Sequence, residues 1–102
     1  MQSVLNKIRP ELMELCQQFH VKRLDLFGSA VTEAFDPVSS DFDFLVEFNP
    51  LPPADYARAF FGLKESLEDL LGRPVDLVVS AAIRNPYFRQ SIEQSKALLY
   101  AA

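Results

Sequence analysis

Residues 24–48, which read LDLFGSAVTEAFDPVSSDFDFLVEF, decide the fold of this chain. The pattern predicts a strand over residues 24–27, a turn at Gly28-Ser29 that opens a short helix, a loop, and a second strand that carries Asp41 and Asp43. Because side chains alternate between the faces of a strand, the two Asp side chains project from one face and the aromatic side chains from the other. Two like charges so placed repel each other unless a cation lies between them, and hard divalent cations prefer such oxygen ligands. The stretch therefore predicts one apolar sheet face and a metal site on the other.

Gly28 and Ser29 predict a phosphate-binding turn. Gly28 lets the backbone turn sharply and approach a ligand closely, and Ser29 stands where a helix would begin, with free N–H groups and a positive dipole end. A third carboxylate, Asp76, lies within an apolar run at residues 74–79, where we do not expect an ordinary surface residue. A phosphate cradle and an Asp-x-Asp pair on the next strand are the parts needed to bind a nucleoside triphosphate with magnesium.

The order and spacing of Gly28-Ser29, Asp41-Phe42-Asp43 and Asp76 resemble the signature of the nucleotidyltransferase superfamily that includes DNA polymerase β and kanamycin nucleotidyltransferase. With 102 residues, the chain is most similar to the minimal nucleotidyltransferases, the MNT group, often found as antitoxins beside HEPN-domain toxins. The resemblance covers nearly the whole chain. It implies a single α/β (α+β) domain over residues 1–102, with a small mixed sheet and helices packed mainly on one face.

The resemblance also implies a chemistry. Asp41, Asp43 and Asp76 would be the catalytic, metal-binding residues of a site with two Mg²⁺ ions, and Gly28 and Ser29 would bind the β- and γ-phosphates of ATP. AMP would then be transferred from ATP to a hydroxyl acceptor. The implied acceptor is a tyrosine of a partner HEPN toxin, which the modification would silence.

One departure from the family pattern leaves other functions open. Members of the group commonly follow Gly-Ser with a basic residue and an Arg-Gly pair, whereas no Lys or Arg stands between Ser29 and Asp41 here. An alternative is therefore an interaction module of the same fold that neutralises its partner by binding alone. A third function is a small-molecule nucleotidyltransferase, such as one that modifies aminoglycosides. Candidates outside the loop for the missing phosphate counterion, if the partner does not supply it, are Lys22, Arg23, Arg58 and Arg84.

Composition and charge narrow the function classes. Hydrophobic residues make up 49% of the chain, which predicts a globular protein and not a disordered one. The net charge of −4 argues against a broad nucleic-acid surface, because neutralising phosphates requires clustered Lys and Arg. With one cysteine, no secretory leader and no long apolar span, we expect no internal disulfide, no membrane segment and a cytoplasmic location. Whether the protein forms a homo-oligomer stays open.

The remaining sequence predicts three further helical segments. Residues 4–19 have helical periodicity interrupted by Pro10, which predicts either a short turn before a helix or one bent helix. A strong helix is predicted over residues 54–71, ended by Gly72, and another from Pro86 to about residue 94. Residues 97–100 could form a strand or continue that helix. The residues expected to be mostly buried are Phe27, Phe42, Phe44, Val46, Leu63, Leu67, Leu77 and Val79.

Several single residues have an ordinary structural interpretation. Cys16 lies on the apolar stripe of the first helix and is expected to be a small core residue. Asp25 is expected either to face outward or to face a helix. Tyr56 and Phe60 stand one helical turn apart, which favours core packing over stacking on a nucleobase.

Overall fold

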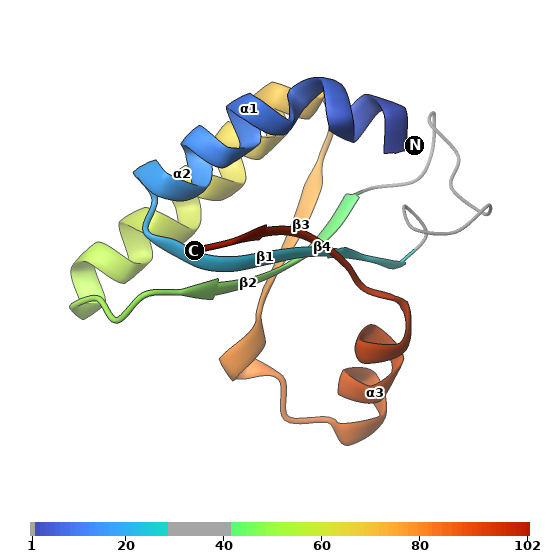
Figure 1. Ribbon diagram of the computed structural model, residues 1–102. Helices are drawn as coiled ribbons and strands as arrows, with labels where there is room; N and C mark the ends of the chain where they lie inside the picture. Colours follow the sequence, from blue (N-terminus) through green and yellow to red (C-terminus); the bar gives the residue numbers. More distant parts are fainter. Residues whose placement is uncertain (1, 29–41) are drawn as a thin grey trace.

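The computed structural model describes residues 2–28 and 42–102, with side chains from residue 6 onward. Along this part of the chain the elements are α1 (Gln2–Gln18), β1 (Val21–Phe27), β2 (Phe42–Phe48), α2 (Pro53–Leu71), β3 (Val75–Val79), the 3-10 turn η2 (Ser80–Ala82), α3 (Pro86–Ser95) and β4 (Ala97–Ala101) (Figure 1). Of the predicted site residues, Ser29 and Asp41 lie outside the described residues.

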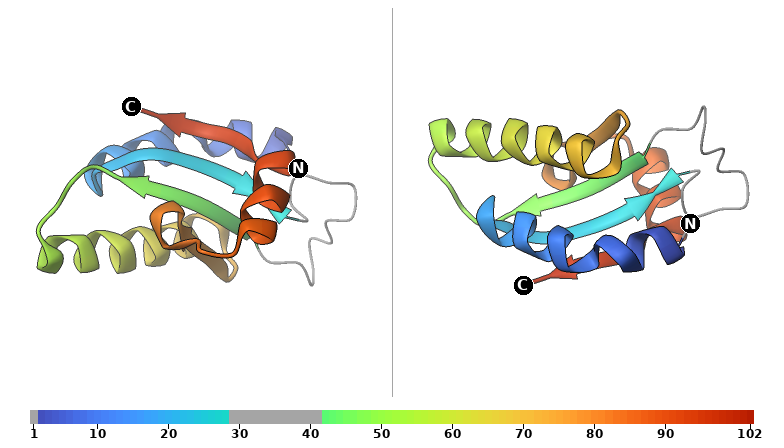
Figure 2. Two further views of the ribbon diagram at one scale, coloured as in Figure 1. Left: turned by 90° about the horizontal axis from the view of Figure 1, so that it is seen from below. Right: turned by 90° about the horizontal axis from the view of Figure 1, so that it is seen from above.

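The four strands form one mixed sheet in the order β3-β2-β1-β4. Strand β1 pairs antiparallel with both β2 and β4, whereas β2 and β3 are parallel. Parallel neighbours require a crossover connection, and α2 provides it. Figure 2 shows α1 and α2 on one face of the sheet and the shorter α3 on the other.

The main core lies between the sheet and the two long helices. The alternation of β2 places Phe42, Phe44 and Val46 on this face, and they are almost fully buried there against Leu63 and Leu67 of α2. Helix α1 packs into the same core. Its contribution includes Leu12 and Cys16, and β1 adds Val21, Leu24 and Leu26.

The packing of Phe19 against α2 depends on a glycine. A Cβ built on Gly62 would lie 2.5 Å from Cε1 of Phe19, so any side chain at this position of α2 would press on the ring. Phe19 itself packs against the main core just beyond the end of α1. A glycine inside a helix costs roughly 0.5–1 kcal/mol relative to alanine, and here it makes room for that ring.

The junction from α2 to β3 is fixed by two hydrogen bonds that Glu68 accepts, one at its backbone and one at its side chain. Gly72 ends α2 in the left-handed conformation, with φ +70°, and its N–H donates to the carbonyl oxygen of Glu68. The Glu68 carboxylate in turn accepts a hydrogen bond of 3.0 Å from the N–H of Val75, the first residue of β3. Glu68 therefore sets where β3 begins, one residue before Asp76.

A second, smaller core lies between the sheet and α3. Its buried members are Phe27, Leu45 and Ile92, with Val78 and Ile83 packed at its margin. The Asn85 side chain caps α3 by accepting hydrogen bonds from the N–H groups of Tyr87 and Phe88. Arg89 holds the helix to the preceding turn by donating to the carbonyl oxygens of Ser80 and Ile83.

Most of the predicted fold is confirmed, including the mixed sheet and its strands near Leu24, Phe42 and Val75. Pro10 lies inside one continuous α1, so no separate turn precedes the helix, and residues 97–101 form a strand and not a continued helix. Among the residues expected to be mostly buried, Val79 is only partly so. None of the described helices is both long enough and apolar enough to span a membrane.

Candidate functional site

Asp43 and Asp76 occupy directly paired positions on the parallel strands β2 and β3. Paired residues on neighbouring strands project to the same face. Asp43 alternates along β2 with Phe42 and Phe44, which are buried beneath the two long helices, so both carboxylates belong to the α3 face. Residues separated by the whole of α2 in the sequence are thus neighbours in the sheet.

Gly28 completes the described part of this site from the other side. The preceding residue, Phe27, is paired with Asp43 across β1 and β2. Gly28 has φ +74°, a left-handed conformation that favours glycine, and a Cβ built on it would collide with Oδ2 of Asp43. The Asp43 carboxylate therefore lies directly against the Gly28 backbone, so the predicted phosphate turn and a predicted metal ligand adjoin each other.

The two carboxylates differ in exposure. Asp43 is partly buried, whereas Asp76 is exposed because β3 is an edge strand of the sheet. The expectation that Asp76 would not be a surface residue was therefore wrong. Its apolar neighbours Val75 and Leu77 are buried in the main core, while Asp76 projects from the opposite face, next to Asp43.

This donor set suits magnesium. Two adjacent carboxylates offer the hard oxygen ligands that Mg²⁺ prefers, and their mutual repulsion would be relieved by a cation. No group of three His, Cys, Asp or Glu side chains able to share an ion occurs within residues 2–28 and 42–102. The third predicted ligand, Asp41, lies outside this part of the chain, so the described site consists of one carboxylate pair beside a glycine turn.

Three of the four basic residues considered as phosphate counterions are ion-paired. Lys22 lies 3.6 Å from Glu47, and Arg58 lies 3.3 Å from Asp55 at the start of α2. Arg23 donates to both oxygens of Asp25, at 3.0 and 3.2 Å. The remaining candidate, Arg84, is exposed in the segment before α3.

A basic residue that the sequence analysis did not consider lies at the site end of the sheet. The Arg73 guanidinium stands over the Phe42 ring, 5.7 Å from its centroid. Phe42 begins β2 and pairs with Val75, so Arg73 lies near the starts of the strands that carry the two carboxylates, but on the face of the Phe42 ring, opposite the carboxylates. Its position three residues before Asp76, at the turn that leads into β3, could have identified it from the sequence.

Asp25 lies on the same sheet face as the carboxylate pair, but its negative charge is paired with Arg23. It is only 1% exposed and pairs with Leu45 across β1 and β2. Arg23 satisfies both of its oxygens, and this hydrogen bond together with the attraction between the charges raises the pKa of the Arg23 guanidinium. Asp25 is thus buried on the helix-facing side, one of the two placements that the sequence left open.

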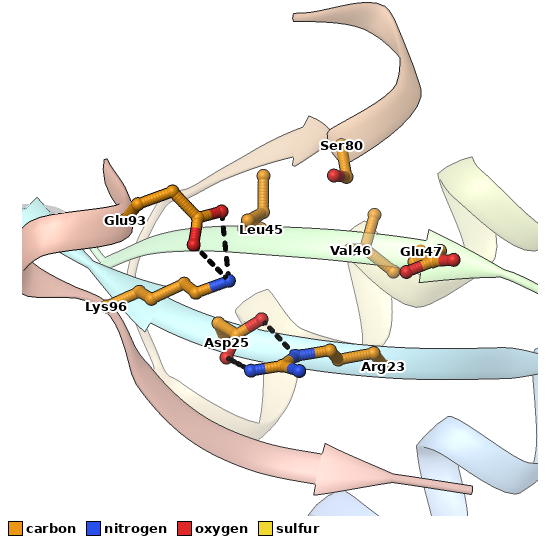
Figure 3. A pocket seen from close by; sticks show the side chains of 8 residues that line it. All are labelled: Arg23, Asp25, Leu45, Val46, Glu47, Ser80, Glu93 and Lys96. Atoms are coloured by element: carbon orange, nitrogen blue, oxygen red, sulfur yellow. Dashed lines mark hydrogen bonds and ion pairs between the residues drawn. The ribbon is translucent and has the colours of Figure 1, made fainter. Parts of the chain in front are cut away.

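A polar pocket of about 190 Å³ surrounds this ion pair (Figure 3). Lys96 extends over it and pairs with Glu93 of α3 at 3.0 Å. The other lining residues are Leu45, Val46, Glu47 and Ser80. Each of the two ion pairs lies within its own segment, Arg23 with Asp25 in β1 and Lys96 with Glu93 at the end of α3, so these four charges are matched within the protein.

A family model for a nucleotidyltransferase domain matches residues 5–99, nearly the whole chain. The chain belongs to this family. The nucleotidyltransferase domain described here therefore has the family expected from Gly28-Ser29, Asp41-Phe42-Asp43 and Asp76, and its mixed sheet agrees with the fold that the resemblance implied.

Curated relatives of this nucleotidyltransferase domain are named for protein adenylylation. A candidate protein adenylyltransferase of Methanocaldococcus jannaschii is 45% identical over 80 residues, which are 78% of either chain. The protein adenylyltransferase MntA of Thermococcus cleftensis is 38% identical over 85 residues, covering 82% of this chain and 78% of the relative.

Solved structures show the same fold. A candidate minimal nucleotidyltransferase superposes with a TM-score of 0.71 at 30% identity, covering 93% of this chain and 92% of the other. The MNT antitoxin complex with the tri-AMPylated HEPN toxin of Shewanella oneidensis contains a match with a TM-score of 0.64 at 20% identity. That match covers 96% of this chain and 73% of the other, and at this identity it shows the fold alone.

Proposed function

We propose that this nucleotidyltransferase domain transfers AMP from ATP to a tyrosine hydroxyl of a partner protein, a HEPN-domain toxin, and thereby acts as an antitoxin. The observation that carries the proposal is the direct pairing of Asp43 and Asp76 beside Gly28. The names of the relatives, protein adenylyltransferases, support the same reaction. The solved complexes that pair this fold with HEPN toxins support the partner class.

In this proposal each residue has a separate task. Asp43 and Asp76, together with Asp41, would hold Mg²⁺, which supplies positive charge to the phosphates and favours deprotonation of the acceptor hydroxyl. Because Gly28 has no side chain, it leaves room for the Asp43 carboxylate and would let its backbone N–H approach the phosphates. Ser29 would contribute its N–H and hydroxyl groups. The exposed position of Asp76 at the sheet edge leaves the acceptor side open to a second protein.

The positive charge that the loop lacks would come in part from Arg73. Its guanidinium stands over the Phe42 ring at the site end of the sheet, on the face opposite the carboxylates, and would extend past the starts of β2 and β3 to reach a phosphate. We expect Arg73→Met to weaken ATP binding by about 1–3 kcal/mol, the usual value of a charge-assisted contact. Isothermal titration with ATP and magnesium measures the loss, and Arg58→Met at the opposite end of the sheet is the matched control.

Mass spectrometry of the partner tests the reaction directly. The protein encoded by the neighbouring open reading frame, a HEPN-domain toxin under this proposal, is incubated with the domain, ATP and magnesium, and its tyrosine peptides are examined for added AMP. We expect modification with wild type and none with Asp43→Asn, which removes one charge from the site at nearly constant volume. An unmodified partner in the presence of folded wild type contradicts the proposal.

A second function is favoured by the absence of Lys and Arg from Ser29 to Asp41. In it, the domain neutralises its partner by binding alone. The same incubation separates the two, because a complex that inhibits the toxin without modifying it supports binding alone. Thr32→Arg, which restores a basic residue after Gly-Ser, should then fail to produce ATP binding.

A further inference from the structure

Tyr87 is by far the most exposed tyrosine of this chain. Its side chain, on the first turn of α3, is 82% exposed. The other two tyrosines, Tyr56 and Tyr100, are both partly buried against the main core. Since nucleophilic attack requires an accessible phenol, Tyr87 is the tyrosine best placed by exposure to act as an acceptor.

Tyr87 lies on the helix that packs against the end of β1 next to the candidate site. Its neighbour Phe88 packs edge-to-face on Phe27, with ring centroids 6.2 Å apart. Phe27 is paired with Asp43, and such pairs place their Cα atoms about 4.5–5.5 Å apart. Tyr87 precedes Phe88 on α3, so its side chain points about 100° around the helix from the ring that contacts Phe27. Figure 2 shows α3 crossing the sheet at the end where β1 finishes and β2 begins, the end that carries Gly28 and Asp43.

The base of this side chain is held firmly although its tip is exposed. Asn85 accepts a hydrogen bond of 2.9 Å from the Tyr87 N–H, and Arg89 ties the same turn of helix to the carbonyl oxygens of Ser80 and Ile83. Ile92, one turn further, is buried in the second core. The helix that bears Tyr87 is therefore held in place, whereas the exposed Tyr87 side chain can rotate.

We propose that Tyr87 is itself an acceptor, so that the domain adenylylates its own chain at this residue; this inference rests on the proposed function. The Tyr87 phenolic oxygen attacks the α-phosphorus of ATP and forms a phosphodiester bond. The bond from the α-phosphorus to the α,β-bridging oxygen breaks, pyrophosphate leaves with the bonding electrons, and the phenolic proton passes to water. The attached AMP then occupies the α3 side of the site and competes with transfer to a partner.

The test is incubation of the full chain with ATP and magnesium, followed by mass spectrometry of the peptide that contains Tyr87. We expect one added AMP on this peptide, and Tyr87→Phe should lower total self-labelling by roughly tenfold or more. Tyr87→Phe keeps the aromatic ring and removes only the hydroxyl, so it leaves contacts of the ring intact. Tyr56→Phe is the matched control, because Tyr56 packs on Phe48 at the opposite end of β2, and it should leave self-labelling unchanged.

A mixing experiment distinguishes transfer within one molecule from transfer between copies. Active Tyr87→Phe is incubated with inactive Asp43→Asn, which retains Tyr87. We expect no label on the Asp43→Asn chain, and label there would overturn the assignment to the same molecule. Transfer to the HEPN partner is measured in parallel: a labelled partner with an unlabelled Tyr87 overturns this inference alone, whereas absence of both labels contradicts the proposed function itself.

Discussion

The carboxylate of Asp43 occupies the space into which a side chain on Gly28 would project. Residue 28 also has a left-handed backbone, with φ +74°. Two separate requirements, one of conformation and one of space, therefore call for glycine at the same position. Gly72 allows the two requirements to be tested separately. It has nearly the same backbone conformation, with φ +70°, but no atom lies within 4 Å of a Cβ built on it.

Gly28→Ala should lower the free energy of unfolding and abolish AMP transfer. Gly72→Ala should lower stability by about 1–2 kcal/mol, the cost of a left-handed alanine, and retain activity. The comparison is made by chemical denaturation and by the transfer assay. If Gly28→Ala retains full activity, the contact between Gly28 and Asp43 is not needed for the reaction.

Asp76→Asn should stabilise the protein in the absence of divalent metal and lose its response to magnesium. Like charges at paired strand positions are destabilising, so removal of one charge relieves repulsion with Asp43. Calorimetry with and without millimolar magnesium measures both effects. Asp69→Asn, an exposed change on α2, is the control and should respond to magnesium as wild type does. An undiminished response in Asp76→Asn would argue against a metal site there.

Gly62→Ala should destabilise the protein although alanine is the better helix former. The gain in helix propensity, about 1 kcal/mol, is opposed by overpacking against Phe19, which typically costs about 1–3 kcal/mol. In a Phe19→Leu background the aromatic ring is gone, and the same substitution should become neutral or stabilising. Denaturation of the four variants gives the coupling energy. Additive effects would show that the contact with Phe19 does not limit residue 62.

Cys16 should make the protein less stable at high pH. Burial raises the pKa of its thiol from 9.0 to about 12, so between these values the unfolded chain loses a proton that the folded chain retains. Stability therefore falls as the pH rises through this window, by at most about 1.4 kcal/mol per pH unit. Cys16→Ala removes this contribution, so the stability difference between wild type and variant should narrow from pH 8 to about pH 10.5. A constant difference would contradict the raised pKa.

The sequence was sufficient for the strands and for most of the core because hydrophobic alternation and helical spacing are local patterns. Alternation alone placed Phe42, Phe44 and Val46 on one face and Asp43 on the other. The pairing of Asp43 with Asp76 was expected only through the family resemblance. This pairing depends on the register between the parallel strands β2 and β3. The α2 crossover and the hydrogen bond from the Val75 N–H to Glu68 set that register, and neither is visible in the local sequence around Asp43.

The exposure of Asp76 and the pairing of Arg23 with Asp25 could not be read from local patterns. Asp76 stands in an apolar run, yet β3 is an edge strand, so one of its faces is open beside α3. Arg23 was a plausible phosphate ligand by charge alone, but residues two apart in a strand share a face, and Asp25 takes both of its hydrogen bonds. Strand order thus determines the exposure of Asp76, and a local ion pair determines that Arg23 is not available to a phosphate.

The central position of β1 has a consequence for synthesis on the ribosome. One neighbour of β1 is β2, but the other is β4, the last strand along the chain, which also contributes the buried Leu99 beside α1. While the chain is still being made, β1 therefore exposes one unpaired edge until β4 leaves the exit tunnel. Such edges pair readily with other chains. We expect nascent chains stopped before residue 97 to be recovered in aggregates or bound to chaperones, and complete chains to be released folded.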